Sequence, residues 1–272
     1  MTMILRPTIL IFCLVTIFSV ESFAQNEKLF LGIRLRPAVR AVADEVEQKT
    51  KKKIYAEFVE FEDEYLLGAS FIDDDGTAIV RANMNLLAEK QKLEAVVAHE
   101  LLHLRLRAGG FPVFLFSPAV KTARGRAQDV EQENVNDLAS LIEHRIFKAE
   151  MDKFGLNQIV NLAGDTERNA TRRRGEPDGQ TDAINFARAV LEYQNTADIE
   201  RLRSIYVQNK WQKSLKIGQE IADLISRSTV DSPPMSAKVF GLCIAKLYPS
   251  PRPFKLTPDK SVKAYRRLLI GF

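Results

Sequence analysis

Apolar positions recur at different intervals along the chain, and each interval predicts a different element. In residues 35–51 apolar side chains recur three and four positions apart, which predicts a helix starting just after Pro37. The acidic turn DDDG at 73–76 is typical of a hairpin. Around it lie short runs rich in β-branched and aromatic residues, at 53–61, 65–72 and 77–84. We expect these runs to form a small, mostly antiparallel sheet.

Longer helical patterns follow the predicted strands. One runs from residue 85 until Gly109 and Gly110, and a second covers 126–155. The apolar stretch between them, 111–120, is expected to be a loop. A polar, glycine-containing segment at 164–182 predicts an exposed linker. Three further helical patterns follow, at 183–195, 196–228 and 236–248. The fold class expected from this order is α+β with an α-helical C-terminal region.

The N-terminus has the pattern of an export signal. One basic residue precedes an apolar block at 8–20, and small residues at Ser22 and Ala24 suit a cleavage site. We therefore expect a signal peptide over residues 1–24, cleaved after Ala24, and a mature protein in the periplasm or outside the cell. No other apolar run approaches the ~20 residues needed to cross a bilayer, so stable membrane insertion is not expected. Cleavage would leave Cys243 as the single cysteine, which excludes an intramolecular disulfide.

Composition limits the classes of function. The 272 residues are 46% hydrophobic and 27% charged, which is enough apolar material for a buried core. The formal net charge is only +4, and basic and acidic residues alternate along most of the chain. This balance gives no basic patch of the kind that nucleic acids require, so we expect no nucleic-acid partner.

Polar residues interrupt the most apolar of the predicted helices. The stretch AVVAHELLHLRL at 95–106 holds His99, Glu100 and His103 among leucines, valines and alanines. Residues four apart share one helix face, so both imidazoles can aim at a single point. A zinc ion binds imidazole nitrogens at about 2.0–2.1 Å and leaves a position for water in catalytic sites. Glu100 is then suited to act as the general base, and the spacing predicts one Zn²⁺ for hydrolysis.

A third zinc ligand has to come from elsewhere in the chain. The only other histidine is His144, on the second long predicted helix. Helical spacing puts Glu133 and His144 on one stripe, whereas Glu143 lies about 100° round, nearer the apolar stripe of the same helix. Imidazole and carboxylate are both accepted zinc ligands. His144 is the first choice, with Glu143 and then Glu133 as alternatives.

These residues resemble a family of proteases. The motif HELLH, preceded by a helix and short strands and followed by a helix with acidic and imidazole groups, looks like a minimal zincin metallopeptidase domain, nearest to the compact gluzincin-like domains. The resemblance covers residues 35–155 and implies zinc binding by His99 and His103 and a general base at Glu100. It also implies that the strand at 77–84 is an edge strand on which an extended peptide could pair.

The chain departs from the family at the third ligand. Such domains place a glutamate ligand in a recognisable downstream motif, whereas here Glu133, Glu143 and His144 compete for the role. The metzincin pattern is not present either, because HLRLRAGG at 103–110 lacks the further histidine.

Two functions remain open from the sequence. The first is a zinc-dependent metallopeptidase acting on a peptide or protein substrate, with a zincin-like domain at 25–160 and a helical region at 183–272. The second is a non-enzymatic exported interaction protein with a structural or vestigial metal site. The predicted helices after residue 183 favour the second function because no catalytic motif is apparent in them.

Overall fold

The computed structural model describes residues 29–62, 66–118, 126–155, 179–193, 195–248 and 254–258. Within these ranges the fold is α+β, as predicted, whereas the predicted signal peptide and most of the predicted linker lie outside them. The elements in chain order are α1 (Pro37–Thr50), β1 (Tyr55–Val59), β2 (Gly68–Ile72), β3 (Ala78–Asn83), the 3-10 helix η1 (Met84–Leu86), α2 (Lys90–Ala108), β4 (Phe114–Pro118), α3 (Arg126–Phe154), α5 (Gln180–Glu192), α6 (Thr196–Gln208), α7 (Gln212–Arg227), α8 (Pro233–Leu247) and β5 (Phe254–Pro258).

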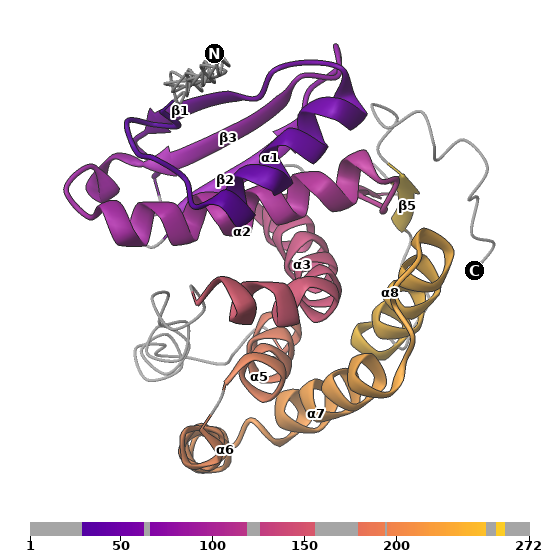
Figure 1. Ribbon diagram of the computed structural model, residues 1–272. Coiled ribbons are helices and arrows are strands. Elements are labelled where there is room, and N and C mark those ends of the chain that lie inside the picture. The colour runs from indigo at the N-terminus through magenta and orange to yellow at the C-terminus, as the bar shows by residue number, and fades with distance from the viewer. Residues whose placement is uncertain are drawn as a thin grey trace, which may run out of the picture.

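Figure 1 shows how these elements are arranged. The three-stranded sheet lies together with α1 and α2, and the helices α5 to α8 lie on the other side of α3. None of the helices in the described ranges is long and apolar enough to cross a membrane. In this arrangement, helix α3 connects the part that carries the HELLH motif with the C-terminal helices.

The three-stranded sheet has the order β1-β3-β2. The predicted hairpin is confirmed, since β2 and β3 pair antiparallel and the turn between them is closed by the N–H of Gly76 donating to the carbonyl of Asp73 at 2.9 Å. β1, however, pairs parallel to β3, with Arg81 and Glu57 joined across the two strands at 2.8 Å. The sheet is thus mixed rather than mostly antiparallel, because β1 runs along the far side of β3 instead of beside its sequence neighbour β2.

This strand order corrects the expectation for residues 77–84. The strand β3 is central, and the outer strands are β1 and β2. β3 also has the most buried side chains of the three, with Ala78, Val80 and Ala82 fully buried. A strand that is paired on both sides has no free edge for a peptide, so any strand addition must use an outer strand.

Helix α2 is buried along most of its length because it packs against the sheet, α1 and α3. Polar contacts hold α2 near both of its ends. Glu94 of α2 accepts the backbone N–H of Arg36 at 2.7 Å and lies 3.0 Å from its Nε, at the start of α1. Near the other end, Nη1 of Arg105 donates to Glu150 of α3 at 2.8 Å. These contacts fix the orientation of the helix that carries the motif.

Helix α3 contributes to two cores. Near its C-terminus, Phe147 and Met151 pack into the core formed by α1, α2 and the sheet. Earlier in the helix, apolar side chains pack into a second core with α5, α7 and α8: Val135, Leu138, Leu141 and Ile142. The second core also holds Cys243, whose thiol is free and buried. The predicted helix at 126–155 is confirmed, and its packing links the predicted protease domain to the C-terminal region.

Two sequence-based boundaries were wrong. The pattern at 196–228 is not one helix, because α6 ends at Gln208 and Lys210 adopts a left-handed conformation (φ 63°) before α7 begins. The stretch at 111–120, expected to be a loop, contains β4, which pairs antiparallel with β5. A strand whose partner lies more than 130 residues away cannot be recognised from local periodicity.

Gly218 allows α7 to pack closely against α5. A Cβ atom at this position would lie 2.5 Å from the carbonyl oxygen of Ala183 and 3.0 Å from Cβ of Phe186. We expect Gly218→Ala to lower the free energy of unfolding by about 1–3 kcal/mol, although alanine favours helices. Urea denaturation checks this, with Ser226→Ala on the exposed face of α7 as the control that leaves stability nearly unchanged. If Gly218→Ala were more stable than the wild type, the close packing of α7 against α5 would be contradicted.

Candidate metal centre

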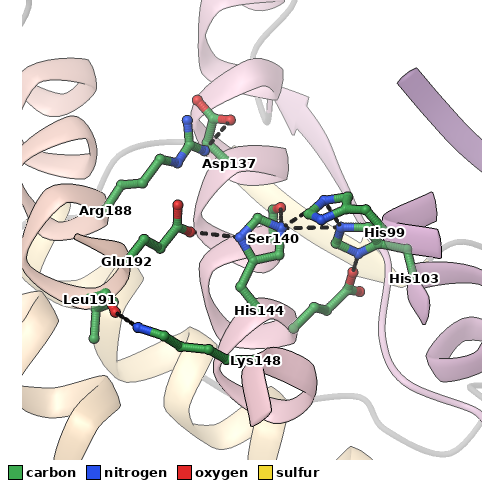
Figure 2. Close-up of polar contacts among 10 residues, drawn as sticks. His99, His103, Asp137, Ser140, His144, Lys148, Arg188, Leu191 and Glu192 are labelled. Atoms are coloured by element: carbon green, nitrogen blue, oxygen red, sulfur yellow. Dashed lines mark hydrogen bonds and ion pairs between the residues drawn. The ribbon is translucent and has the colours of Figure 1, made fainter. Parts of the chain in front are cut away.

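Three histidines from two helices meet at one point. His99 and His103 lie one turn apart on α2, and His144 comes from α3 (Figure 2). The three Nε2 atoms form a triangle with sides of 3.0 Å (His99 to His103), 3.1 Å (His99 to His144) and 3.2 Å (His103 to His144). The structure thus brings together the two motif histidines and the first choice for the third ligand, close enough to hold a metal ion.

An aromatic ring packs against this cluster. Phe147, on the turn of α3 after His144, has its ring centroid 5.6 Å from that of His99 and 5.0 Å from that of His103, in edge-to-face geometry. Phe147 is itself buried in the core. Its position three residues after His144 follows from helical periodicity, which places both side chains on the side of α3 that faces α2.

Two carboxylates hold the imidazoles from behind. Nδ1 of His103 contacts Oε2 of Glu143 from α3, and Nδ1 of His144 lies 2.6 Å from Oε1 of Glu192 from α5 (Figure 2). An ionised carboxylate accepts hydrogen bonds but cannot donate them, so each Nδ1 carries the hydrogen. In a neutral imidazole the Nε2 atom then carries a lone pair. The carboxylates therefore select the tautomer that a metal ligand requires.

The geometry of the cluster fits a metal ion. The Nε2 atoms of His103 and His144 face each other across 3.2 Å, and with both hydrogens on Nδ1 two lone pairs point together. Such an arrangement is repulsive between the two nitrogens. The hydroxyl of Ser140, 3.0 Å from Nε2 of His144, can donate to one of these lone pairs, and a cation between the nitrogens would satisfy them together. Tetrahedral zinc with nitrogen ligands at 2.0–2.1 Å requires these nitrogens to be about 3.3 Å apart. The observed triangle is within a few tenths of an ångström of that spacing.

Burial keeps the motif histidines neutral. It lowers the pKa of both His99 and His103 well below the ordinary value of 6.5, and the neighbouring His144 lowers the two pKa values further. Burial works to raise the pKa of Glu192, but the charge and hydrogen bond of His144 prevail and lower it. The two motif imidazoles are thus neutral, and an ionised carboxylate lies behind the third, which suits binding of a divalent cation.

Glu100 follows His99 on α2 and lies under the outer strand β2. Its side chain is buried, and burial raises its pKa above the ordinary value of 4.5. A Cβ atom at Gly68 of β2 would lie 3.2 Å from Oε1 of Glu100 and 2.6 Å from the side chain of Val96. The absence of a side chain at Gly68 therefore lets β2 run directly over the general-base candidate.

Arg107 connects the outer strand to the carboxylate behind His103. It lies one turn after His103 on α2, and its Nη1 donates to the backbone carbonyl of Ser70 in β2. Its Nη2 lies 4.0 Å from Oε2 of Glu143. Burial raises the pKa of Glu143, and the charge of Arg107 opposes that rise. The sequence analysis did not single out Arg107, although the spacing of four from His103 places it on the same face.

The three alternatives for the third ligand occupy different places. His144 joins the cluster, and Glu143 is buried behind His103 rather than among the Nε2 atoms. Glu133 is exposed, and it is not part of the cluster. Glu192 was missed because it lies beyond the predicted linker. The signal available for it was an acidic residue one turn after Arg188 in a segment rich in apolar residues.

The pKa of His103 predicts how stability depends on pH. Because the unfolded chain protonates this imidazole near pH 6.5 and the folded protein does not, the unfolded state binds more protons below that pH. The free energy of unfolding of the metal-free protein should therefore fall as the pH drops from 6.5 to 5.5, with a contribution from this group of up to about 1.4 kcal/mol per pH unit. Urea denaturation in the presence of a chelator measures it, and His103→Gln should show the shallower dependence. Equal slopes for the two proteins would contradict the neutral, buried state of His103.

Comparison with known proteins leaves the site to be interpreted from its own residues. No protein-family model, curated protein or solved structure matches this chain. The basis for a function is therefore the side-chain geometry: three imidazoles that face one point from α2 and α3, with carboxylates behind two of them. Glu100, the residue after His99, is buried on the same helix.

Proposed function

We propose that this protein is a zinc-dependent metallopeptidase that hydrolyses peptide bonds in peptide or protein substrates. The observation that carries the proposal is the triangle of Nε2 atoms from His99, His103 and His144, together with the buried carboxyl group of Glu100, the residue after His99 on α2. Three imidazoles are a ligand set that zinc accepts in catalytic sites. With the predicted signal peptide, we expect this activity in the periplasm or outside the cell.

Each residue of the site has a role in this reaction. When bound, zinc lowers the pKa of a water molecule and polarises the scissile carbonyl. Glu100 accepts a proton on its carboxylate and returns it to the leaving amine, which is the exchange expected of a general base that becomes a general acid. Glu143 and Glu192 hold the rings of His103 and His144 in place through Nδ1.

The outer strand β2 supports a peptide as the substrate. The carbonyl of Leu67, just before β2, accepts the N–H of Asn83 at 2.9 Å, so the backbone groups of Leu67 face β3. Backbone groups in a strand alternate between its two sides. The groups that point away from β3 are therefore those of Gly68, Ser70 and Ile72, of which the carbonyl of Ser70 already accepts from Arg107. An extended peptide that pairs with this edge would pass beside Glu100, which is the role that the sequence had assigned to the strand at 77–84.

A structural metal site is the second candidate function. The observation that favours it is the burial of His103 and Glu143, which are 5% and 4% exposed. In structural zinc sites all four coordination positions are filled by protein, and the metal contributes to folding. Hydrolysis that depends on Glu100 separates the two functions, because a structural site does not need this carboxylate.

Replacement of Glu100 by glutamine tests the peptidase function. We expect Glu100→Gln to retain one zinc ion per chain, because the three imidazoles remain, and to lower kcat/KM about 10²–10⁴-fold, because the general base is lost. Zinc content by elemental analysis and cleavage of casein or cell-wall peptides measure the two quantities. The matched control is Glu133→Gln, an exposed glutamate on α3 outside the cluster, which should leave both unchanged. Equal turnover by Glu100→Gln and the wild type would exclude the proposed mechanism.

A further inference from the structure

The C-terminal helices contain a residue that acts on the candidate metal centre. We propose that Glu192 of α5 is a positioning residue for His144, so that the zinc site is complete only when α5 is packed against α3. This inference rests on the proposed function, because it assumes that His99, His103 and His144 hold a metal ion. It assigns a chemical role to the part of the chain in which the sequence showed none.

Apolar packing and polar contacts both join α3 to α5. Four polar contacts are spread along α3 from residue 134 to residue 148, and together they set the position of α5 beside the histidine cluster. They are Asn134 with Thr181 (3.0 Å), Asp137 with Arg188 (2.8 Å), His144 with Glu192 (2.6 Å) and Lys148 with the carbonyl of Leu191 (3.0 Å). The last three are visible in Figure 2.

The surroundings of Glu192 favour a specific role in holding His144. Its side chain is only 11% exposed, and its Oε2 atom is buried without a hydrogen-bond partner among the described residues. Part of the cost of burying this carboxylate is offset by the nearby charges of Arg188 and Lys148, and the carboxylate also accepts a hydrogen bond from His144. Oε1 of Glu192 contacts Nδ1 of His144, and this hydrogen bond holds the imidazole ring in place.

The same arrangement occurs twice in the site. His103 of α2 is held by Glu143 of α3, and His144 of α3 is held by Glu192 of α5. Each helix thus supplies the carboxylate for a histidine of the preceding one. Metal binding by the last histidine in this series should depend on α5, and removal of the metal should in turn loosen α5.

Zinc affinity of the full-length protein tests the proposal without reference to activity. Competition with a chromophoric chelator should show zinc binding about tenfold weaker in Glu192→Gln, which keeps an acceptor but loses the charge, and up to about 100-fold weaker in Glu192→Ala. The control is Glu200→Gln, whose side chain is 61% exposed on α6, and its affinity should equal that of the wild type. The absorption spectrum of bound Co²⁺ should change in both Glu192 variants and stay constant in the control.

A merely structural role for Glu192 gives a different pattern. If Glu192 acts through the metal ligand, Glu192→Gln should have no further effect on zinc affinity in a His144→Ala background, and zinc should protect amides of α5 from hydrogen exchange in the wild type only. Wild-type zinc affinity in the correctly folded Glu192 variants overturns the inference, whatever their activity. Zinc binding that depends on Glu192 in a protein without hydrolysis supports the inference and rejects the peptidase function instead. A wild-type chain that binds no zinc overturns both.

Discussion

Carboxylate and imidazole pairs buried among apolar side chains are the interactions on which the rest of this structure depends. His103 and Glu143 lie almost fully inside the protein, where neither group could remain alone without a large cost in free energy. Their contact lowers the cost of burial for both groups, because the carboxylate accepts the hydrogen of Nδ1. The pairing leaves the lone pair of Nε2 aimed at the other histidines, and this remaining polarity is what a metal ion would neutralise.

The arrangement of the helices brings these histidines and carboxylates together. α2 provides two histidines on the face that meets α3, so its other faces are free to pack against the sheet and α1. α3 has to contact both α2 and the C-terminal helices, because its neighbouring residues Glu143 and His144 serve the two sides. This explains why one helix contributes apolar residues to two separate cores. The candidate metal centre and the junction between the two halves of the chain are therefore the same place.

Local patterns predicted many elements and failed where pairing was decided at a distance. The helices at 37–50 and 126–154 and the hairpin of β2 and β3 agree with their periodicity and turn residues. Strand order was not accessible in this way, because alternation shows that β3 is a strand but not that it has β1 as a second neighbour. The strand at 114–118 was missed for the same reason, since its partner is β5 near the C-terminus.

The sequence by itself determined that His99 and His103 would share one helix face, because a spacing of four on a helix brings two side chains to one face whatever surrounds them. Only the tertiary structure decided which of His144 and Glu143 joins the two motif histidines. These two residues are adjacent, about 100° apart on α3, and the angle at which α3 crosses α2 turns one imidazole towards the cluster and one carboxylate behind it. The role of Glu192 was decided in the same way, because its contact with His144 exists only through the packing of α5 on α3.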